Sequence, residues 1–352
     1  MTTMVSMRQL MVAATMAAAL PLAAHAQDRI RVVATLPTYA SIALEITGGL
    51  AQIDAIARGD EDAHFVNPRP SFAALIQRAD LFITTGLDLE LWVPVLLDRA
   101  NNRRVVEGAP GHVVAYAGVK LLDVPQDVSR SGGDVHIYGN PHLHSDPINA
   151  IIIARNILAG LERVDQRNAA TYRANEARFE DRVVRRLFGD RIVEMLGAET
   201  LIDLARTEDF WAFAEANTYE GRPVTAYLGG WLAKALPLRG HPVVCYHKNW
   251  AYFSARFGVP CAMFVEPKAG IPPTPGHVRD VIDFIRRERI PALLAANYFS
   301  RSQVQQVAVR AGVTAVYVPE HVHGAEGVDD YFTLVDTWVD GLVSAFAKAG
   351  SP

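Results

Sequence analysis

The sequence predicts an α/β protein of two lobes, each with a mostly parallel β-sheet flanked by helices, joined by a long and rigid helical segment. From Ile30 onward, short apolar runs alternate with longer amphipathic stretches, and the second half repeats this alternation. A segment with few helix breakers separates the halves. Of the 352 residues, 50% are hydrophobic and 20% are charged, a composition typical of folded globular proteins.

The first half contains four apolar runs that we interpret as strands. Helical periodicity fills the intervals between the first three runs and continues after the third. The predicted strands are Ile30–Leu36, Gln52–Ala57, Leu81–Thr85 and Val113–Ala117, and the predicted helices lie around Ile42–Ile46, Ser71–Arg78 and Glu90–Asp98. They form a first lobe that we expect to span residues 27–144.

The middle of the chain begins with Ser145-Asp146-Pro147, a helix cap followed by proline at the first helical position. We expect one or two long helices over residues 145–196, acting as a strut between the sheets, since thirty helical residues already span a small domain. Residues 197 to about 240 do not fit the β-α alternation and are interpreted as an insertion within the second lobe, residues 197–352. Its aromatic cluster, Phe210 to Phe213, is expected to form local core, with a substrate-facing or partner-facing surface as the alternative.

The second half contains four further apolar runs. Thr274-Pro275 predicts a helix start, Ser300 is expected to cap the helix that runs to Arg310, and the last helix is expected over residues 329–347. The predicted strands are Pro242–Tyr246, Ala262–Val265, Ala292–Ala296 and Ala315–Val318.

The N-terminus has the features of a secretory signal peptide over residues 1–26. Arg8 precedes an apolar run, Leu10–Leu20, that is short for a membrane span, and Ala24 and Ala26 suit signal peptidase. A retained membrane anchor is the alternative, and no cysteine near the cut could accept a lipid. We therefore expect a periplasmic protein without a lipid anchor. Its net charge, −4 for the whole chain, argues against nucleic acid as a partner.

Cys245 and Cys261 are the two cysteines of the sequence, and in an exported protein they can be oxidised. If their apolar runs are neighbouring strands, a disulfide is geometrically allowed. Alternatively, Cys245 helps to bind a metal together with His247, on the same strand face. The sequence leaves both interpretations open.

Four candidate ligands lie where parallel strands end, which is where such sheets build sites. His64 follows the second strand, His142 precedes the long helical segment, His247 ends the first strand of the second half, and Glu320 ends the last strand. Three imidazoles and one carboxylate suit four-coordinate Zn²⁺. Because the four are far apart in sequence, their spacing alone carries little weight.

Four segments resemble those of periplasmic solute-binding proteins of zinc and manganese ABC transporters, the cluster A-I group. Asp62–Ser71 resembles the first ligand loop of that group, Asn140–Pro147 the second, and Tyr246–Phe253, followed by Val265-Glu266-Pro267, the third. Val316–Glu320 lies where the group usually has an aspartate, and here His321 and His323 compete with Glu320. His144 stands where the group prefers an aromatic residue, so we expect it to pack.

The resemblance implies a metal held between two lobes, at His64, His142, His247 and Glu320, and delivered to a membrane permease. A histidine at position 247 favours zinc, because manganese-type members usually have a carboxylate there.

The expected partners are the permease and, as a second candidate, a periplasmic metallochaperone. The receptor is expected to be monomeric. An exported zinc hydrolase and a receptor for manganese or another divalent metal are the alternatives. No His-Glu-x-x-His helix or Gly-x-Ser-x-Gly turn supports catalysis. His136, in a glycine-bearing loop, is expected to be solvated, with transient metal collection as the alternative.

Overall fold

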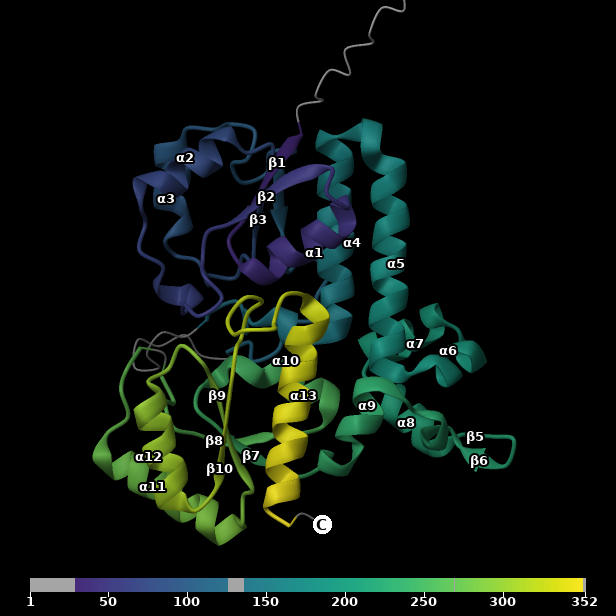
Figure 1. Cartoon of the computed structure of the whole chain (residues 1–352), viewed down its shortest axis with the longest axis vertical. Coiled ribbons are helices and arrows are strands. Elements are labelled where there is room, and N and C mark those ends of the chain that lie inside the picture. Colours follow the sequence, from purple (N-terminus) through teal and green to yellow (C-terminus); the bar gives the residue numbers. More distant parts are fainter. Residues whose placement is uncertain (1–28, 126–135, 269, 351–352) are drawn as a thin grey trace, which may run out of the picture.

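The computed structural model describes residues 29–125, 136–268 and 270–350, and the predicted signal peptide lies outside them. Two α/β lobes lie one above the other in Figure 1. Within the described residues, no helix is both long enough and apolar enough to span a bilayer.

The first lobe contains a four-stranded parallel sheet in the order β2-β1-β3-β4, as the alternation of apolar and amphipathic segments predicted. The strand β3 is buried at all four positions, which is typical of a parallel sheet covered on both faces. The elements of this lobe are β1 (Ile30–Ala34), α1 (Pro37–Thr47), β2 (Ala51–Ala55), α2 (Pro70–Arg78), β3 (Leu81–Thr84), α3 (Val93–Ala100) and β4 (His112–Val114).

The second lobe contains a parallel sheet in the order β10-β9-β7-β8. Thr274 caps α11 as expected, because its side chain accepts a hydrogen bond from the His277 N–H. Ser300 precedes α12, but its hydroxyl bonds that of Ser302 and makes no capping bond, so that detail was wrong. The elements are β7 (Val243–Cys245), α10 (Ala251–Phe257), β8 (Cys261–Phe264), α11 (Pro275–Glu288), β9 (Ala292–Ala296), α12 (Arg301–Ala311), β10 (Thr314–Val318) and α13 (Tyr331–Lys348).

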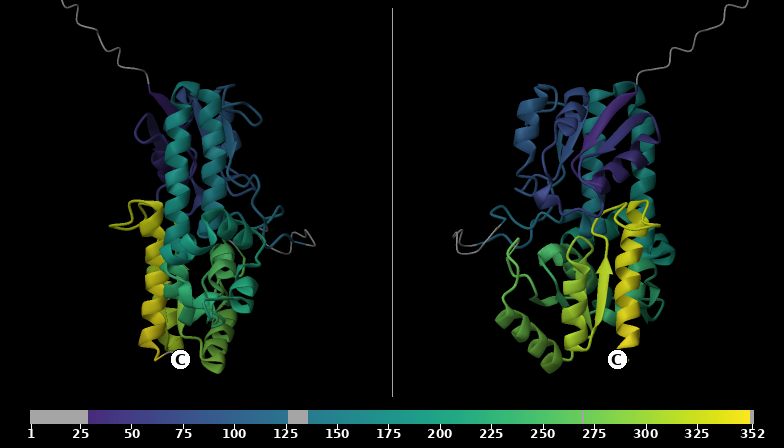
Figure 2. Two further views of the ribbon diagram at one scale, coloured as in Figure 1. Left: turned by 90° about the vertical axis from the view of Figure 1, so that its right-hand side faces the viewer. Right: turned by 60° about the vertical axis from the view of Figure 1, so that its left-hand side comes forward.

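The lobes are joined by two long helices that lie side by side, α4 (Pro147–Val164) and α5 (Ala169–Phe188). Asp146 caps α4 by accepting from the Ile148 N–H, in agreement with the cap-and-proline signal. The helix α5 contacts α1 of the first lobe and α9 (Gly230–Ala235) beside the second, and Figure 2 shows it running along the long axis of the molecule. The link is therefore helical and stiff.

A set of short elements follows α5 and packs against its lower end (Figure 1). Phe210 is fully buried and packs edge-to-face on Phe188, which confirms that the aromatic cluster is local core. These elements are α6 (Asp190–Leu196), α7 (Ala198–Arg206) and α8 (Phe210–Ala216). The hairpin of β5 (Thr218–Tyr219) with β6 (Arg222–Pro223) continues from α8, which it contacts, and projects away from α5.

Cys245 and Cys261 are joined by a disulfide, with their Cα atoms 5.4 Å apart. Cys245 ends β7 and Cys261 begins β8, and the two strands are parallel neighbours. The strand adjacency on which the disulfide depended is thus confirmed. Because its sulfur is bonded to Cys261, Cys245 is excluded as a metal ligand.

Candidate metal centre between the lobes

The four predicted ligands come from both lobes and from the segment that joins them. His64 lies in a short 3-10 helix after β2, His142 precedes α4, His247 follows β7 and Glu320 follows β10. The ring centroids of His64 and His142 are 5.3 Å apart. His142 Nε2 is 3.6 Å from Glu320 Oε1, which is too long for a hydrogen bond.

His247 is electrostatically coupled to this group. Burial holds the pKa of His142 well below its usual range, and repulsion from neighbouring histidines, His247 among them, lowers it further. Burial likewise lowers the pKa of His247 to about 4. Both rings are therefore neutral near pH 7, the state in which imidazole binds a metal.

The local contacts fix which nitrogen of each ring can bind a cation. The Nδ1 atom of His64 lies 2.6 Å from Asp62 Oδ1, that of His142 lies 2.8 Å from Asn140 Oδ1, and that of His247 lies 3.0 Å from the Glu266 carbonyl. Each of these oxygens can only accept, so each Nδ1 donates its N–H, and Nε2 retains the lone pair. This is the arrangement that orients metal-binding histidines in proteins.

Two atoms of the site are left without a usual partner. Among the residues that the structure describes, neither His142 Nε2 nor Glu320 Oε1 has a hydrogen-bond partner, although both are buried. An unsatisfied buried polar group costs about 1–3 kcal/mol, so two that face each other call for an explanation. A cation between them would satisfy both.

Glu320 is held by the second lobe and is 2% exposed. Asn249 donates to its Oε2 at 3.0 Å, and Tyr298 lies beside them. Burial, reinforced by the negative charge of Asp62, raises the pKa of Glu320 to about 7. A positive charge near Oε1 would stabilise the carboxylate form.

The loop between β10 and α13 places the three candidates for the last position in different surroundings. His321 is buried, with its Nδ1 3.2 Å from the Thr38 hydroxyl. His323 is turned outward, its side chain 63% exposed, and lies 3.9 Å from Asp329. Of the three residues, Glu320 thus faces His142, His321 lies deeper and His323 faces away.

His136 was expected to be solvated, and that expectation was wrong. Its side chain is 15% exposed, its Nδ1 donates to Asp88 Oδ1 at 2.9 Å, and its Nε2 lies 3.0 Å from the Nε2 of His64. Because both Nδ1 atoms donate to carboxylates, two Nε2 lone pairs would face each other unless a proton or a cation lies between them. The structure thus brings a further histidine to the site.

A second pair of histidines lies beneath the first group. His144 and His321 are 0% and 2% exposed, and their ring centroids are 4.7 Å apart. His144 packs edge-on against Tyr39, as expected for a packing residue. Burial lowers the pKa of His144 to about 4 and lowers that of His321 well below its usual range. Both rings are therefore neutral.

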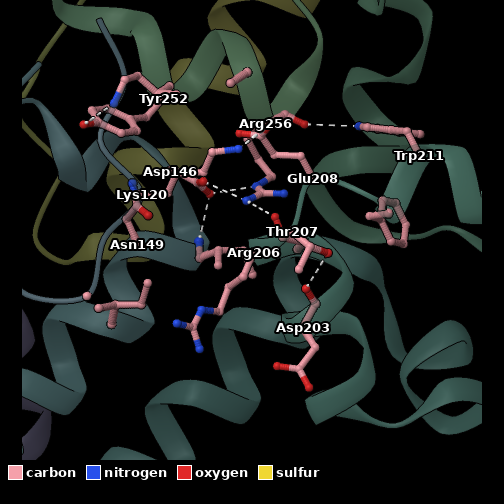
Figure 3. Close-up of a pocket in the computed structure, with 17 residues that line it drawn as sticks. Lys120, Asp146, Asn149, Asp203, Arg206, Thr207, Glu208, Trp211, Tyr252 and Arg256 are labelled. Carbon is pink, nitrogen blue, oxygen red and sulfur yellow. Dashed lines mark hydrogen bonds and ion pairs between the residues drawn. The ribbon is translucent and has the colours of Figure 1, made fainter. Parts of the chain in front are cut away.

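An ion pair behind the site fixes the second ligand loop. Arg256 of α10 makes two parallel hydrogen bonds of 2.8 Å to Asp146, and it also donates to the carbonyl of Ala205 in α7 (Figure 3). Both side chains are about nine-tenths buried, and bidentate pairs of this kind are geometrically specific. The cavity in this view, about 710 Å³, lies behind the ligand loop, so its residues support the site rather than line it.

The zinc-uptake complex component A periplasmic family, ZnuA, matches residues 32–185 and 214–345. The chain belongs to this family. The predicted insertion, about 197–240, overlaps the unmatched stretch only over residues 197–213. ZnuA members are substrate-binding proteins, so this chain is a metal-binding component of an ABC transporter that works with membrane components, and it is not an enzyme.

Two curated relatives match almost the whole chain. The iron-binding protein YfeA of Yersinia pestis is 23% identical over 323 residues, covering 91% of this chain and 87% of YfeA. The manganese ABC transporter substrate-binding lipoprotein PsaA of Streptococcus pneumoniae is 20% identical over 328 residues, covering 91% and 90%. The names of these relatives differ in metal, so they leave the metal of this chain open.

Solved structures agree with the fold. A crystal structure of ZnuA superposes with a TM-score of 0.66 at 17% identity, covering 90% of this chain and 99% of that one. A manganese-bound periplasmic metal-binding protein from Candidatus Liberibacter asiaticus gives a TM-score of 0.60 at 18% identity, covering 90% and 98%. The two-lobed α/β fold expected from the sequence is therefore shown.

Sequence reasoning missed the partners that orient the candidate ligands and His136. Asp62, Asn140 and Asp88 each hold an imidazole, and Asn249 holds Glu320. Two of them could have been found, because Asp62 and Asn140 each stand two residues before a ligand in the same segment. Asp88 could not, because 48 residues separate it from His136.

Proposed function

We propose that this chain captures Zn²⁺ between its lobes, through His64, His142, His247 and Glu320, and delivers it to an ABC permease for import. The observation that carries the proposal is the facing pair of buried and unsatisfied atoms, His142 Nε2 and Glu320 Oε1, at 3.6 Å. Two ligands at about 2.1 Å from a tetrahedral zinc lie roughly 3.4 Å apart. A zinc ion fits this pair with almost no movement.

The donor set favours zinc over manganese or another hard cation. Three neutral imidazoles with one carboxylate are nitrogen-rich, whereas Mn²⁺ and Mg²⁺ prefer carboxylate, carbonyl and water oxygens. His247 distinguishes the two metals, because manganese-type members usually have a carboxylate at this position. Here the Nδ1 of His247 donates to the Glu266 carbonyl, which leaves its Nε2 to bind a metal. A manganese receptor remains the alternative, since a relative such as PsaA is named for manganese.

The chain is proposed to act in the periplasm after export by its N-terminal segment. PsaA is named a lipoprotein, whereas both cysteines of this sequence are joined to each other, so neither thiol is available for acylation. We propose that the receptor is monomeric and not lipid-anchored. The permease is its proposed partner, and a periplasmic metallochaperone is a second candidate.

Zinc stoichiometry and affinity of the mature chain test the proposal. We expect one tight zinc per chain and a large loss of affinity in each of His64→Ala, His142→Ala, His247→Ala and Glu320→Ala. His323→Asn is the matched control, because His323 lies on the same loop but faces outward, and asparagine tolerates its positive φ of 62°. Unchanged zinc binding in all four ligand variants would contradict the proposed site, and tighter binding of Mn²⁺ than of Zn²⁺ would favour the alternative.

His136 enters the same experiment as a neighbour of the ligand set. Tetrahedral zinc takes four ligands, so we propose that His136, whose Nε2 lies 3.0 Å from that of His64, stands beside the ligand set and is not a fifth ligand. His136→Ala is then expected to weaken zinc binding less than His64→Ala does. If it weakened binding as much as His64→Ala, His136 would replace one of the four.

A further inference from the structure

Three buried groups gather beneath the proposed zinc site. One ring nitrogen of His144, one of His321 and one carboxylate oxygen of Glu320 all lie within 4.8 Å of one another, and all three residues are buried. Ligands of a tetrahedral zinc lie roughly 3.4 Å apart, so each atom needs to move by less than about 1 Å to close around a cation.

The contacts of His144 leave one of its nitrogens available. His144 Nε2 lies 3.0 Å from the Glu320 carbonyl oxygen, which can only accept, so Nε2 carries the hydrogen and Nδ1 keeps its lone pair. Within the described part of the chain, this buried Nδ1 has no hydrogen-bond partner. A buried acceptor left in this state is the kind of group that a cation would satisfy.

His321 can adopt the matching tautomer. The Thr38 hydroxyl oxygen accepts from the Val322 N–H at 3.3 Å and lies 3.2 Å from His321 Nδ1. A hydroxyl oxygen has two lone pairs, so it can accept from both, which leaves the His321 Nε2 lone pair for a metal. Thr38 would then orient His321 as carbonyls and carboxylates orient other metal-binding histidines.

We propose that His144, His321 and Glu320 form an inner cation position, which takes a borderline divalent ion such as Zn²⁺. This inference rests on the proposed function only in that Glu320 belongs to both ligand sets. Two dications sharing one carboxylate would repel each other in a buried site with little compensating charge. The inner position is therefore an alternative to the outer one, and a single ion occupies one or the other.

The inner position, like the outer one, lies between the lobes, because Thr38 of α1 contacts His321 while the remaining contacts come from the second lobe. His321 and Glu320 follow β10 directly, and His144 is fixed to that loop through the Glu320 carbonyl. The Tyr331 hydroxyl at the start of α13 donates to the His144 carbonyl at 2.9 Å. An ion held there keeps its contact with the second lobe even when His64 no longer binds it.

The experiment separates the two positions by variants of the full mature chain. The double variant His64→Ala/His142→Ala removes outer ligands, and His144→Phe or His321→Gln is then added to it singly. His323→Asn, added to the same double variant, is the matched control. Zinc content after dialysis, zinc affinity by competition with a chromogenic chelator, and the visible absorption of Co²⁺ in place of Zn²⁺ are measured.

We expect the double variant to retain one zinc at an affinity at least 100-fold below wild type. His144→Phe and His321→Gln should each abolish that residual zinc, together with the Co²⁺ bands, while His323→Asn should leave them intact. Circular dichroism checks the folding of each chain. If one of the two inner variants does not fold, the other still tests the proposal.

Three results would overturn the inner position. The first is a folded double variant that binds no zinc. The second is residual zinc that survives both His144→Phe and His321→Gln. The third is a wild type that holds two zinc ions at saturation. A wild type that binds no zinc at all would overturn the proposed function instead. Tight wild-type zinc that disappears in the double variant would leave the proposed function standing and remove only the inner position.

Discussion

The outer and inner histidine pairs of this site are built in opposite ways. His64 and His136 lie nearer the surface, and each donates its Nδ1–H to a carboxylate, Asp62 or Asp88. His144 and His321 are fully buried, and their fixed nitrogens face the uncharged oxygens of the Glu320 carbonyl and Thr38. We infer that charged carboxylates orient the outer rings, whereas packing and hydrogen bonds to uncharged oxygens orient the inner rings.

His142 stands between the two pairs, and its loss should have the largest effect. Zinc binding by four ligands is worth about 10–16 kcal/mol, so removing one ligand is expected to cost about 3 kcal/mol, or roughly 100-fold in affinity. His142→Ala also removes the orphaned Nε2 that faces Glu320. Competition with a zinc chelator measures the change, and a loss below about 3-fold would place His142 outside the ligand set.

The pH dependence of folding should report the burial of His144 in the inner pair. The pKa of His144 is about 4 in the folded metal-free chain and about 6.5 when unfolded, because burial disfavours the charged ring. Between pH 6.5 and 4 the unfolded chain binds a proton that the folded chain does not, so stability falls as pH falls through this window. The shift corresponds to about 3 kcal/mol.

His144→Phe should therefore flatten the stability curve of the metal-free chain by about that amount over this pH range. The opposite contribution of Glu320, whose raised pKa favours the folded state at low pH, is present in both proteins and cancels in the difference. Denaturant unfolding at pH 7, 5.5 and 4 makes the measurement, with His323→Asn as the control that should keep the wild-type slope. Equal slopes in wild type and His144→Phe would show that His144 titrates normally.

The carboxylate behind an outer ring should matter less than a ligand. Asp62→Ala removes the acceptor that holds His64 Nδ1 at 2.6 Å, and such changes behind a metal ligand typically cost 10–100-fold in affinity. Asp62→Asn keeps an acceptor oxygen at the same place but removes the charge, so it is expected to recover only part of the loss. If both variants bound zinc as the wild type does, charge would not orient the outer rings and the comparison would fail there.

The sequence predicted the scaffold well because the relevant signals are local. Apolar runs marked all eight strands of the two sheets, and cap-and-proline pairs marked the starts of α4 and α11. The candidate ligands followed from one further rule, that parallel strands place their ends at a common edge. This rule did not separate Glu320 from the two histidines that follow it within three residues, because only the fold shows that His323 turns outward.

The remainder of the site depends on contacts that no local pattern encodes. His144 and His321 are 177 positions apart, and the contact between their rings depends on how the start of α4 and the loop after β10 are brought together. His136 lies in a loop without periodicity, so nothing nearby in the sequence distinguished a solvated ring from one held by Asp88. The disulfide likewise required the pairing of β7 with β8.

Thr38 gives the smallest expected effect and the sharpest test of the inner arrangement. Thr38→Val keeps the shape but removes the hydroxyl that contacts His321 Nδ1 and the Val322 N–H, leaving two buried groups unsatisfied. We expect about 1–2 kcal/mol lower stability in the metal-free chain, measured by urea unfolding. Zinc affinity of the otherwise wild-type chain should change by less than about 3-fold, because the outer ligands still bind, and Thr38→Ser should restore stability apart from a lost methyl group. A large loss of zinc affinity in Thr38→Val would mean that the inner histidines already contribute to the wild-type site at equilibrium.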